Sequence, residues 1–343
     1  MKKLVQALLI LAILFSCSAT KNNTGGKSSK INNDTAVEQV KSIVVPYTLE
    51  NVKQIITKES IKKNLEYLAS DALEGRNTGT KGIEKAAVYI EEFFEKHNIK
   101  PYFETYRDTF NMEKIIGYNV VGYIEGSDEK LKNEFVVLGA HYDHIGTTKE
   151  FNSDTIANGA NDNAAGTSAV LEIAKYLANK KDNKRSIMFA LFSAEEKGLL
   201  GSKHLSKRLK GENLNLYTMV NFEMVGVPFK DRNYEAFVTG FDLSNMAEKI
   251  NSYTASGLIG KSEVAIKYNL FERSDNYPFY QEFNVPCQSI SSCDMSNFDY
   301  YHHVDDEVDK LDFEFMTSLI IKVIPAIEKM SNTETKEIKM YNE

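Results

Sequence analysis

The sequence predicts a layered α/β fold built on a mostly parallel β-sheet. Short, almost wholly apolar runs alternate along the chain with amphipathic segments, as strands do when helices cover both faces of a sheet. The composition is that of a globular protein, with 42% hydrophobic and 26% charged residues in a chain of 343. Ligands of such sheets bind beyond the carboxyl ends of the strands, so we expect the functional site at that edge.

The predicted helices have apolar residues three and four positions apart. In the clearest case, Ile83, Ala86, Ala87, Ile90 and Phe94 form one apolar face. The remaining helices continue this series along the chain. Helices are expected, in chain order, at residues 61–68, 83–94, 170–177, 199–209, 243–253 and 311–330.

The predicted strands are short and rich in apolar residues. Residues 135–140 and 187–193 are almost wholly apolar, which is typical of strands buried on both faces. The other strands alternate with the helices, as a parallel sheet requires. Strands are expected, in chain order, at residues 102–110, 118–124, 135–140, 187–193, 217–224, 236–239 and 285–290.

The first 45 residues predict an export signal followed by a linker. A positive start and an apolar run from Leu4 to Phe15 are typical of a secretory signal peptide, and the run is too short to span a membrane. The ending Leu14-Phe15-Ser16-Cys17 resembles the bacterial lipobox. It implies a signal peptide at residues 1–16, a lipid on Cys17, and an exported protein anchored in the bacterial cell envelope, periplasmic or at the cell surface. A plain signal peptide with an incidental cysteine is the alternative.

The segment that follows is polar, which predicts a flexible tether over residues 17–45 and a single folded domain over residues 46–343. The formal charge is −7, so we expect no basic stripe and no nucleic-acid partner. Three cysteines are too few for a disulfide scaffold. Cys287 and Cys293 remain open between a disulfide, which an oxidising compartment would permit, and two separate thiols.

Histidines and acidic residues follow several of the predicted strands. Taken singly, each has an ordinary structural reading as a surface turn, a helix start or a helix cap. Several carboxylates in one cleft would repel each other unless cations neutralised them, and histidine with carboxylate suits Zn²⁺ or a similar ion. The residues concerned are His141, Asp143, His144, Asp162, Glu195, Glu196, Glu223, His302, Asp305 and Asp306.

All of these residues except His144 fall in five ordered motifs: His141-x-Asp143, Gly159-Ala160-Asn161-Asp162-Asn163-Ala164-Ala165-Gly166, Ser193-Ala194-Glu195-Glu196-x-Gly198, Asn221-x-Glu223-Met224 and Tyr301-His302-x-x-Asp305-Asp306. The set resembles the zinc-dependent exopeptidase family that includes bacterial leucyl-type aminopeptidases, glutamate carboxypeptidase and, more distantly, glutaminyl cyclases. The resemblance covers roughly residues 60–330. It implies a three-layer α/β/α sandwich around a mixed, mostly parallel sheet, and a metal-dependent exopeptidase, most simply an aminopeptidase acting on peptides.

The resemblance also implies a site for two zinc ions. By its pattern, His141 and Glu223 would bind one ion, Glu196 and His302 the other, and Asp162 both. His302 is preferred to His303 because it directly follows the tyrosine of the motif. Where Glu223 stands the family more often has aspartate, so we expect altered affinity or identity of the ion on that side, or else a backbone adjusted to ordinary ligation.

Two further residues have expected catalytic roles. Asp143 lies two positions after His141 on an extended chain, so its carboxylate would hydrogen-bond the imidazole and fix its tautomer. Glu195 and Glu196 point apart because they are neighbours on a strand end. Glu195 would therefore face the metal-bound water as general base while Glu196 ligates metal.

Three alternatives to an aminopeptidase are compatible with the fold. A glutaminyl cyclase would act on one zinc ion. The cyclases resemble one another in having tryptophans around the site, including one just before the last histidine ligand, whereas this chain has Tyr301 at that position and contains no tryptophan. A non-catalytic binding lipoprotein of the same fold would usually lose ligands or the base, whereas every position here carries a competent side chain. A carboxypeptidase or dipeptidase stays open, because end preference depends on pocket walls.

Overall fold

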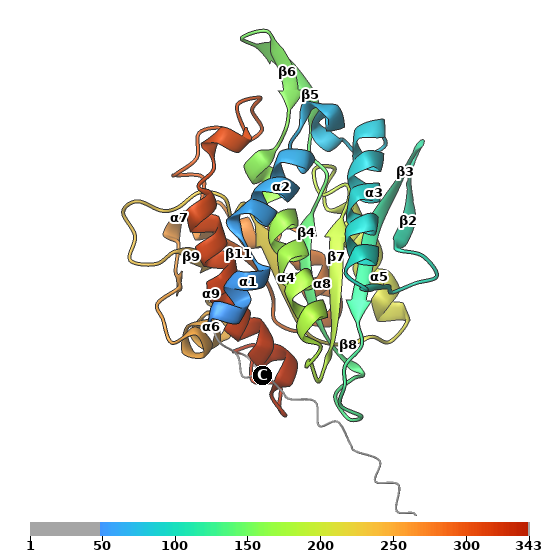
Figure 1. The fold of residues 1–343 in the computed structure, drawn as a ribbon, viewed down its shortest axis with the longest axis vertical. Coiled ribbons are helices and arrows are strands. Elements are labelled where there is room, and N and C mark those ends of the chain that lie inside the picture. Colours follow the sequence, from blue (N-terminus) through green and yellow to red (C-terminus); the bar gives the residue numbers. More distant parts are fainter. Residues whose placement is uncertain (1–48, 342–343) are drawn as a thin grey trace, which may run out of the picture. The chain divides into compact units, whose positions relative to one another are not determined.

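A nine-stranded sheet forms the middle layer of the structure (Figure 1). The computed structural model describes residues 49–341. The strand order is β1-β3-β7-β4-β8-β11-β9-β10, β2 also pairs with β3, and β5 and β6 form a separate hairpin. The strands are β1 (Lys100–Pro101), β2 (Arg107–Met112), β3 (Ile115–Ile124), β4 (Glu134–His141), β5 (Gly146–Phe151), β6 (Asp154–Ala157), β7 (Ser186–Phe192), β8 (Asn215–Glu223), β9 (Ala236–Val238), β10 (Ile259–Gly260) and β11 (Cys287–Ser291).

The four central strands of this sheet are parallel. β4 pairs in parallel with β7 and β8, and β8 pairs in parallel with β11. β3 is antiparallel to β7, and β9 is antiparallel to β11, so the predicted mixed, mostly parallel sheet is confirmed. The register sets His141 opposite Phe192 and Glu223 opposite Ser291. The carboxyl ends of the central strands therefore meet at one edge.

Helices cover both faces of the sheet, as the three-layer prediction requires. α4 packs on β4, β7 and β8 from one face with α2, α3 and α9 beside it, while α5 and α8 pack on the other face. The helices are α1 (Leu49–Ile55), α2 (Lys58–Leu68), α3 (Lys81–Lys96), α4 (Gly166–Lys180), α5 (Leu200–Gly211), α6 (Met246–Thr254), α7 (Glu263–Lys267), α8 (Asn276–Phe283) and α9 (Phe313–Asn332), with short turns η1 (Asp71–Arg76), η2 (Ala160–Ala165), η3 (Leu270–Glu272) and η4 (Val308–Lys310).

Two hydrophobic cores hold the layers together. The larger joins the α4 side of the sheet to its helices, and the smaller lies under α5 and α8, with Phe192, Leu205 and Phe279 among its members. The strands β7 and β8 are buried along nearly their whole length between the two cores. Burial of both faces explains why these strands have near-continuous apolar sequences.

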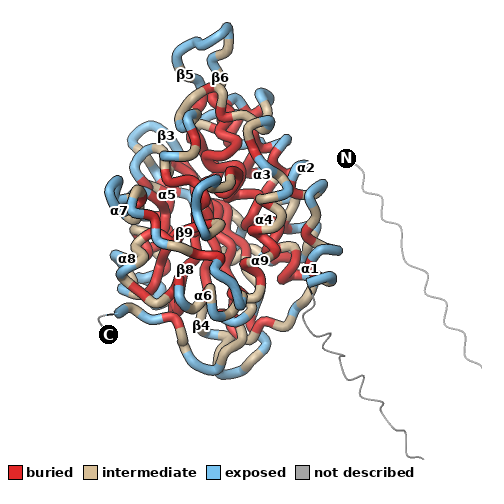
Figure 2. The backbone as a smooth tube through the Cα atoms, turned by 90° about the vertical axis from the view of Figure 1, so that its left-hand side faces the viewer, coloured by how far each residue is buried: buried red, intermediate tan, exposed pale blue. Residues whose placement is uncertain are grey.

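The structure differs from the predicted elements in a few places. β2 begins at Arg107, five residues after the expected start. The β5–β6 hairpin, which was not predicted, projects from the molecule and is largely exposed (Figures 1 and 2), so its sequence lacks the apolar face that marks a strand. Cys287 and Cys293 are both buried free thiols, so the disulfide left open by the sequence does not form here.

The predicted signal peptide at residues 1–16, the tether at residues 17–45 and the lipid attachment at Cys17 lie outside the described residues. Within residues 49–341, which fall in one compact unit, no helix has both the length and the apolarity to span a membrane.

Candidate active site

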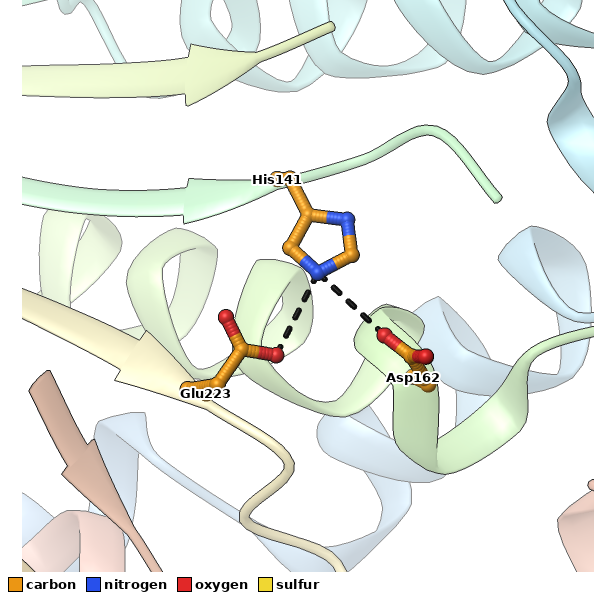
Figure 3. A group of neighbouring side chains, drawn as sticks. All are labelled: His141, Asp162 and Glu223. Carbon is orange, nitrogen blue, oxygen red and sulfur yellow. Dashed lines mark hydrogen bonds and ion pairs between the residues drawn. The ribbon is translucent and has the colours of Figure 1, made fainter. Parts of the chain in front are cut away.

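His141, Asp162 and Glu223 form the first group of the candidate site (Figure 3). His141 ends β4, Glu223 ends β8, and Asp162 lies in η2, the turn that leads into α4. The Nε2 atom of His141 lies 3.2 Å from Oε1 of Glu223 and 3.3 Å from Oδ1 of Asp162. The other oxygen of Glu223 accepts a hydrogen bond from the Ser274 hydroxyl at 2.6 Å. Glu223 therefore faces the group and is held there.

A second group lies against the other oxygen of Asp162. His302 Nε2 is 3.3 Å from Oδ2 of Asp162 and 3.0 Å from Oε2 of Glu196. His144 Nδ1 is 2.9 Å from the other Glu196 oxygen. His303 does not take part: its ring contacts Phe151 and its Nδ1 lies 3.5 Å from Asp305.

The contacts of Asp162 fit a carboxylate that bridges two cations. Its two oxygens divide between the groups, and Oδ2 has no partner in hydrogen-bonding geometry among the described residues although the residue is buried. His302 Nε2 likewise approaches carboxylates without a hydrogen bond. Four ligand atoms at 2.0–2.1 Å around a tetrahedral zinc ion lie about 3.3 Å apart. The observed separations match atoms that converge on shared ions, so the donor set fits two zinc ions.

Neighbouring residues hold the turn that carries Asp162. The carboxylate of Asp306 accepts the backbone N–H groups of Asn161 and Asp162 at 2.8 and 3.0 Å. The Asn163 side chain donates to the carbonyl of Phe222 and accepts from the N–H groups of Gly166 and Met224. Burial raises the pKa of Asp306 to about 7, although its hydrogen bonds oppose the shift. These bonds fix Asp162 relative to the end of β8.

Arg76 joins the loop after β4 to the Asp162 loop. Its buried guanidinium donates to the carbonyls of Tyr142, Asn158 and Gly159 at 2.9, 2.6 and 3.0 Å, and also to that of Leu68. Burial lowers its pKa to about 10, but the surrounding carboxylates, Asp306 foremost, favour the charged form. Arg76 therefore supplies a fixed positive charge behind the acidic site.

Glu195 stands beside both groups at the wall of a cavity. Its carboxylate lies within 4.8 Å of ligand atoms of His141 and Glu196. Burial raises its pKa well above the usual range; the charge of His141 opposes this, while Asp275 and Glu223 add to it. Such a carboxylate is suited to accept a proton near neutral pH.

Asp143 does not make the hydrogen bond expected from the sequence. His141 Nδ1 bonds the backbone carbonyl of Asp143 at 3.1 Å, and the carboxylate lies 3.7 Å away. The carboxylate instead accepts the backbone N–H of Glu195 at 3.1 Å and the Thr78 hydroxyl at 3.3 Å. The chain turns between residues 141 and 143, so Asp143 positions Glu195 rather than the imidazole.

Two imidazoles of the site, those of His141 and His302, have raised pKa values in the absence of metal. Burial lowers the pKa of His302, but the adjacent carboxylates of Asp162 and Glu196 outweigh burial and raise it to about 10. The pKa of His141 is raised well above its usual value, because Glu223 and Glu195 outweigh its burial. Protons thus balance the carboxylates where metal ions would, and the two compete for the site.

The cavity beside Glu195 has a volume of about 360 Å³. Its walls are mostly apolar, with hydroxyl groups and one arginine among the polar atoms, so it suits a side chain of moderate size. The lining residues beyond the two groups are Met224, Phe237, Thr239, Tyr268, Leu270, Arg273, Ser274, Ser289, Ser291, Cys293, Met295, Phe298 and Tyr301.

Sequence reasoning placed six residues that the structure brings together: His141, Asp162, Glu195, Glu196, Glu223 and His302. It gave no role to His144, Ser274, Asp306 or Arg76. Asp306 is the last residue of the Tyr301–Asp306 motif and lies two residues before the turn η4, and membership of this motif was the only signal in the sequence that pointed to it. The other three act through contacts between distant segments.

Comparisons with known proteins identify peptidases that are similar to this chain. The Bacillus subtilis aminopeptidase YwaD is 28% identical over 222 residues, which cover 58% of this chain and 45% of YwaD. A probable zinc metalloprotease of Pyrenophora teres f. teres is 29% identical over 205 residues, covering 57% of this chain and 40% of the relative. The matched region thus spans less than half the length of these curated relatives.

Solved structures share the fold. The LapA aminopeptidase of Legionella pneumophila superposes with a TM-score of 0.65 at 22% identity, covering 90% of this chain and 81% of LapA. Porphyromonas gingivalis glutaminyl cyclase superposes with a TM-score of 0.63 at 16% identity, and the match covers 80% of this chain and 99% of the cyclase. A model of peptidase family M28 matches residues 119–323, which include every residue of the two groups. Since that match spans more than half of the sequence, the chain belongs to peptidase family M28.

Proposed function

We propose that this protein is a zinc-dependent aminopeptidase that releases N-terminal residues from peptides. One observation carries the proposal: two groups of imidazoles and carboxylates share Asp162, and Glu195, which lies beside them, lines a cavity together with the first group. The similarity to an aminopeptidase of Bacillus subtilis and to probable zinc metalloproteases supports the same activity.

Two zinc ions are proposed for the two groups. His141, Asp162 and Glu223 would hold one ion, and Asp162, Glu196 and His302 the other. Zinc supplies Lewis acid chemistry, lowering the pKa of water and polarising the carbonyl of the bond to be cleaved. Ser274 keeps the longer side chain of Glu223 directed at His141, which supports ordinary ligation on that side.

Glu195 is the proposed general base. Its carboxylate takes a proton from the attacking water and returns it to the leaving amine, so one group serves both halves of the reaction. Asp143 orients Glu195 through the backbone N–H of that residue. The mostly apolar cavity beside Glu195 would receive the side chain of the first substrate residue.

The test is hydrolysis of aminoacyl p-nitroanilides with and without a zinc chelator. The Glu195→Gln variant is expected to keep its metal content and lose at least about 10²-fold in turnover, as removal of a general base does. Glu282→Gln, an exposed change on α8, is the matched control and should behave as wild type. Full activity of Glu195→Gln, or activity that survives complete zinc removal, would refute the assignment.

Peptides with blocked ends distinguish the alternatives. An aminopeptidase cleaves peptides with a free amino terminus and spares their N-acetylated forms, whereas a carboxypeptidase cleaves both. Loss of ammonia from glutaminyl peptides without peptide-bond cleavage would instead indicate cyclase activity.

We also propose that the protein is exported and anchored in the cell envelope by a lipid on Cys17. The apolar start of the chain and its lipobox-like ending support this. Cys17→Ser should move the protein from the membrane fraction to the soluble fraction without altering its specific activity. A variant that remains in the membrane fraction would refute the lipid anchor.

A further inference from the structure

His144 is a buried histidine at the metal groups to which sequence reasoning gave no role. It follows the end of β4 by three residues and has no exposed surface. Its Nδ1 atom lies 2.9 Å from Oε1 of Glu196 and 3.8 Å from Oδ2 of Asp162. His141, the last residue of β4, lies against the opposite oxygen of Asp162. The end of β4 and the loop after it thus direct one imidazole to each side of the shared carboxylate.

The surroundings of His144 leave its ring little freedom to turn away. Its backbone N–H donates to the carbonyl of Arg76, and its ring meets the His302 ring edge-on with centroids 5.6 Å apart. Gly159 packs directly against the ring, since a Cβ atom at residue 159 would lie only 2.5 Å from two carbons of the His144 imidazole. Nε2 has no hydrogen-bond partner among residues 49–341, so the polar contacts of the ring all run through Nδ1.

We propose that His144 is a fourth ligand of the ion held by Asp162, Glu196 and His302. The inference rests on the proposed zinc pair and specifies how the pair is coordinated. The contacts of His144 and His302 with the two carboxylates measure 2.9, 3.0, 3.3 and 3.8 Å. These values bracket the roughly 3.3 Å expected between ligand atoms around tetrahedral zinc.

The consequence is a difference between the two ions. Four protein ligands close a zinc site, whereas three leave a position open for water or substrate. The ion at His141, Asp162 and Glu223 keeps the open position, and the ion at His144 is held by the protein alone. The second ion should therefore bind more tightly and be the last to leave on chelation.

A role as hydrogen-bond donor to Glu196 is the competing interpretation, and two variants separate it from ligation. His144→Asn places an amide near the position of Nδ1 and keeps a donor for Glu196, while His144→Ala removes both functions. Loss of a ligand should weaken one ion by more than about 100-fold, since loss of an outer partner alone costs 10–100-fold. His204→Ala, at a partly exposed position on α5, is the matched control.

The measurements are zinc content after dialysis, zinc affinity by chelator competition, and X-ray absorption of the zinc-loaded protein to count imidazole ligands. We expect three imidazoles over two ions in the wild type. Both His144 variants should have two imidazoles, one ion of wild-type affinity and one weakened ion, with native circular dichroism.

Two imidazoles in the wild type, or wild-type affinity in His144→Asn, would overturn ligation by His144. If the wild type cleaves aminoacyl substrates with two zinc ions bound and only these results fail, the proposed function stands. A wild type that binds no zinc would overturn both.

Discussion

Shortening Glu223 to aspartate tests whether the site is built around the longer side chain. Oε1 of Glu223 lies 3.2 Å from His141 Nε2, and Oε2 accepts the Ser274 hydroxyl at 2.6 Å. Removal of one methylene withdraws the carboxylate by about 1.5 Å, one carbon–carbon bond. The backbone is not free to follow, because Glu223 is paired with Ser291 in the sheet. A zinc–oxygen bond of about 2.0–2.2 Å cannot stretch that far.

We therefore expect Glu223→Asp to weaken the ion on the His141 side and to lower kcat by roughly 10²-fold, the cost of misplacing a reacting group by about 1 Å. Zinc affinity by chelator competition and aminoacyl p-nitroanilide turnover measure the two effects. Ser274→Ala keeps the ligand but frees Oε2, so its loss in affinity should stay within about 10–100-fold. Glu223→Asp with zinc affinity and turnover within threefold of wild type would refute the reasoning.

Two further predictions concern the metal-free fold. Arg76→Met leaves buried carbonyls without their donor, so it should lower the free energy of unfolding, measured in denaturant, by about 3 kcal/mol or more. Arg76→Lys keeps the charge and should lower the free energy of unfolding by less. An Arg76→Met variant as stable as wild type would contradict this bracing role. Raising the pH from about 6.5 to about 10 should lower the melting temperature of chelator-treated protein, because the raised pKa of His302 means that its protonated form stabilises the fold and is lost over that range. Bound zinc should abolish that decline, and a pH-independent melting temperature without metal would contradict it.

The fold and most of the site followed from the sequence because both depend on the buried central strands. Strands such as β7 are recognisable from continuous apolar sequence, and their ends locate His141 and Glu223 without further information. Asp162 and His302 were found only through the order of the motifs, since neither follows a strand.

The remaining features depend on contacts that sequence patterns do not carry. The loop from His141 to His144 is irregular, so spacing gives no side-chain direction; this is why the carboxylate of Asp143 was wrongly expected to bond the imidazole. Ser274 reaches Glu223 across 51 residues of chain. The β5–β6 hairpin has no apolar face to mark it.

The hydrogen bonds of Arg76 to the loops of the site set a minimum length for a fragment that could form this site by itself. The family match begins at residue 119, downstream of Arg76, and yet contains all the metal-directed side chains. A fragment cut at that boundary would keep every ligand and lose the guanidinium that joins the loop after β4 to the Asp162 loop. The segment needed to build the candidate site is therefore larger than the segment that identifies the family, and the amino-terminal helices α2 and α3, which flank Arg76, belong to the scaffold of that site.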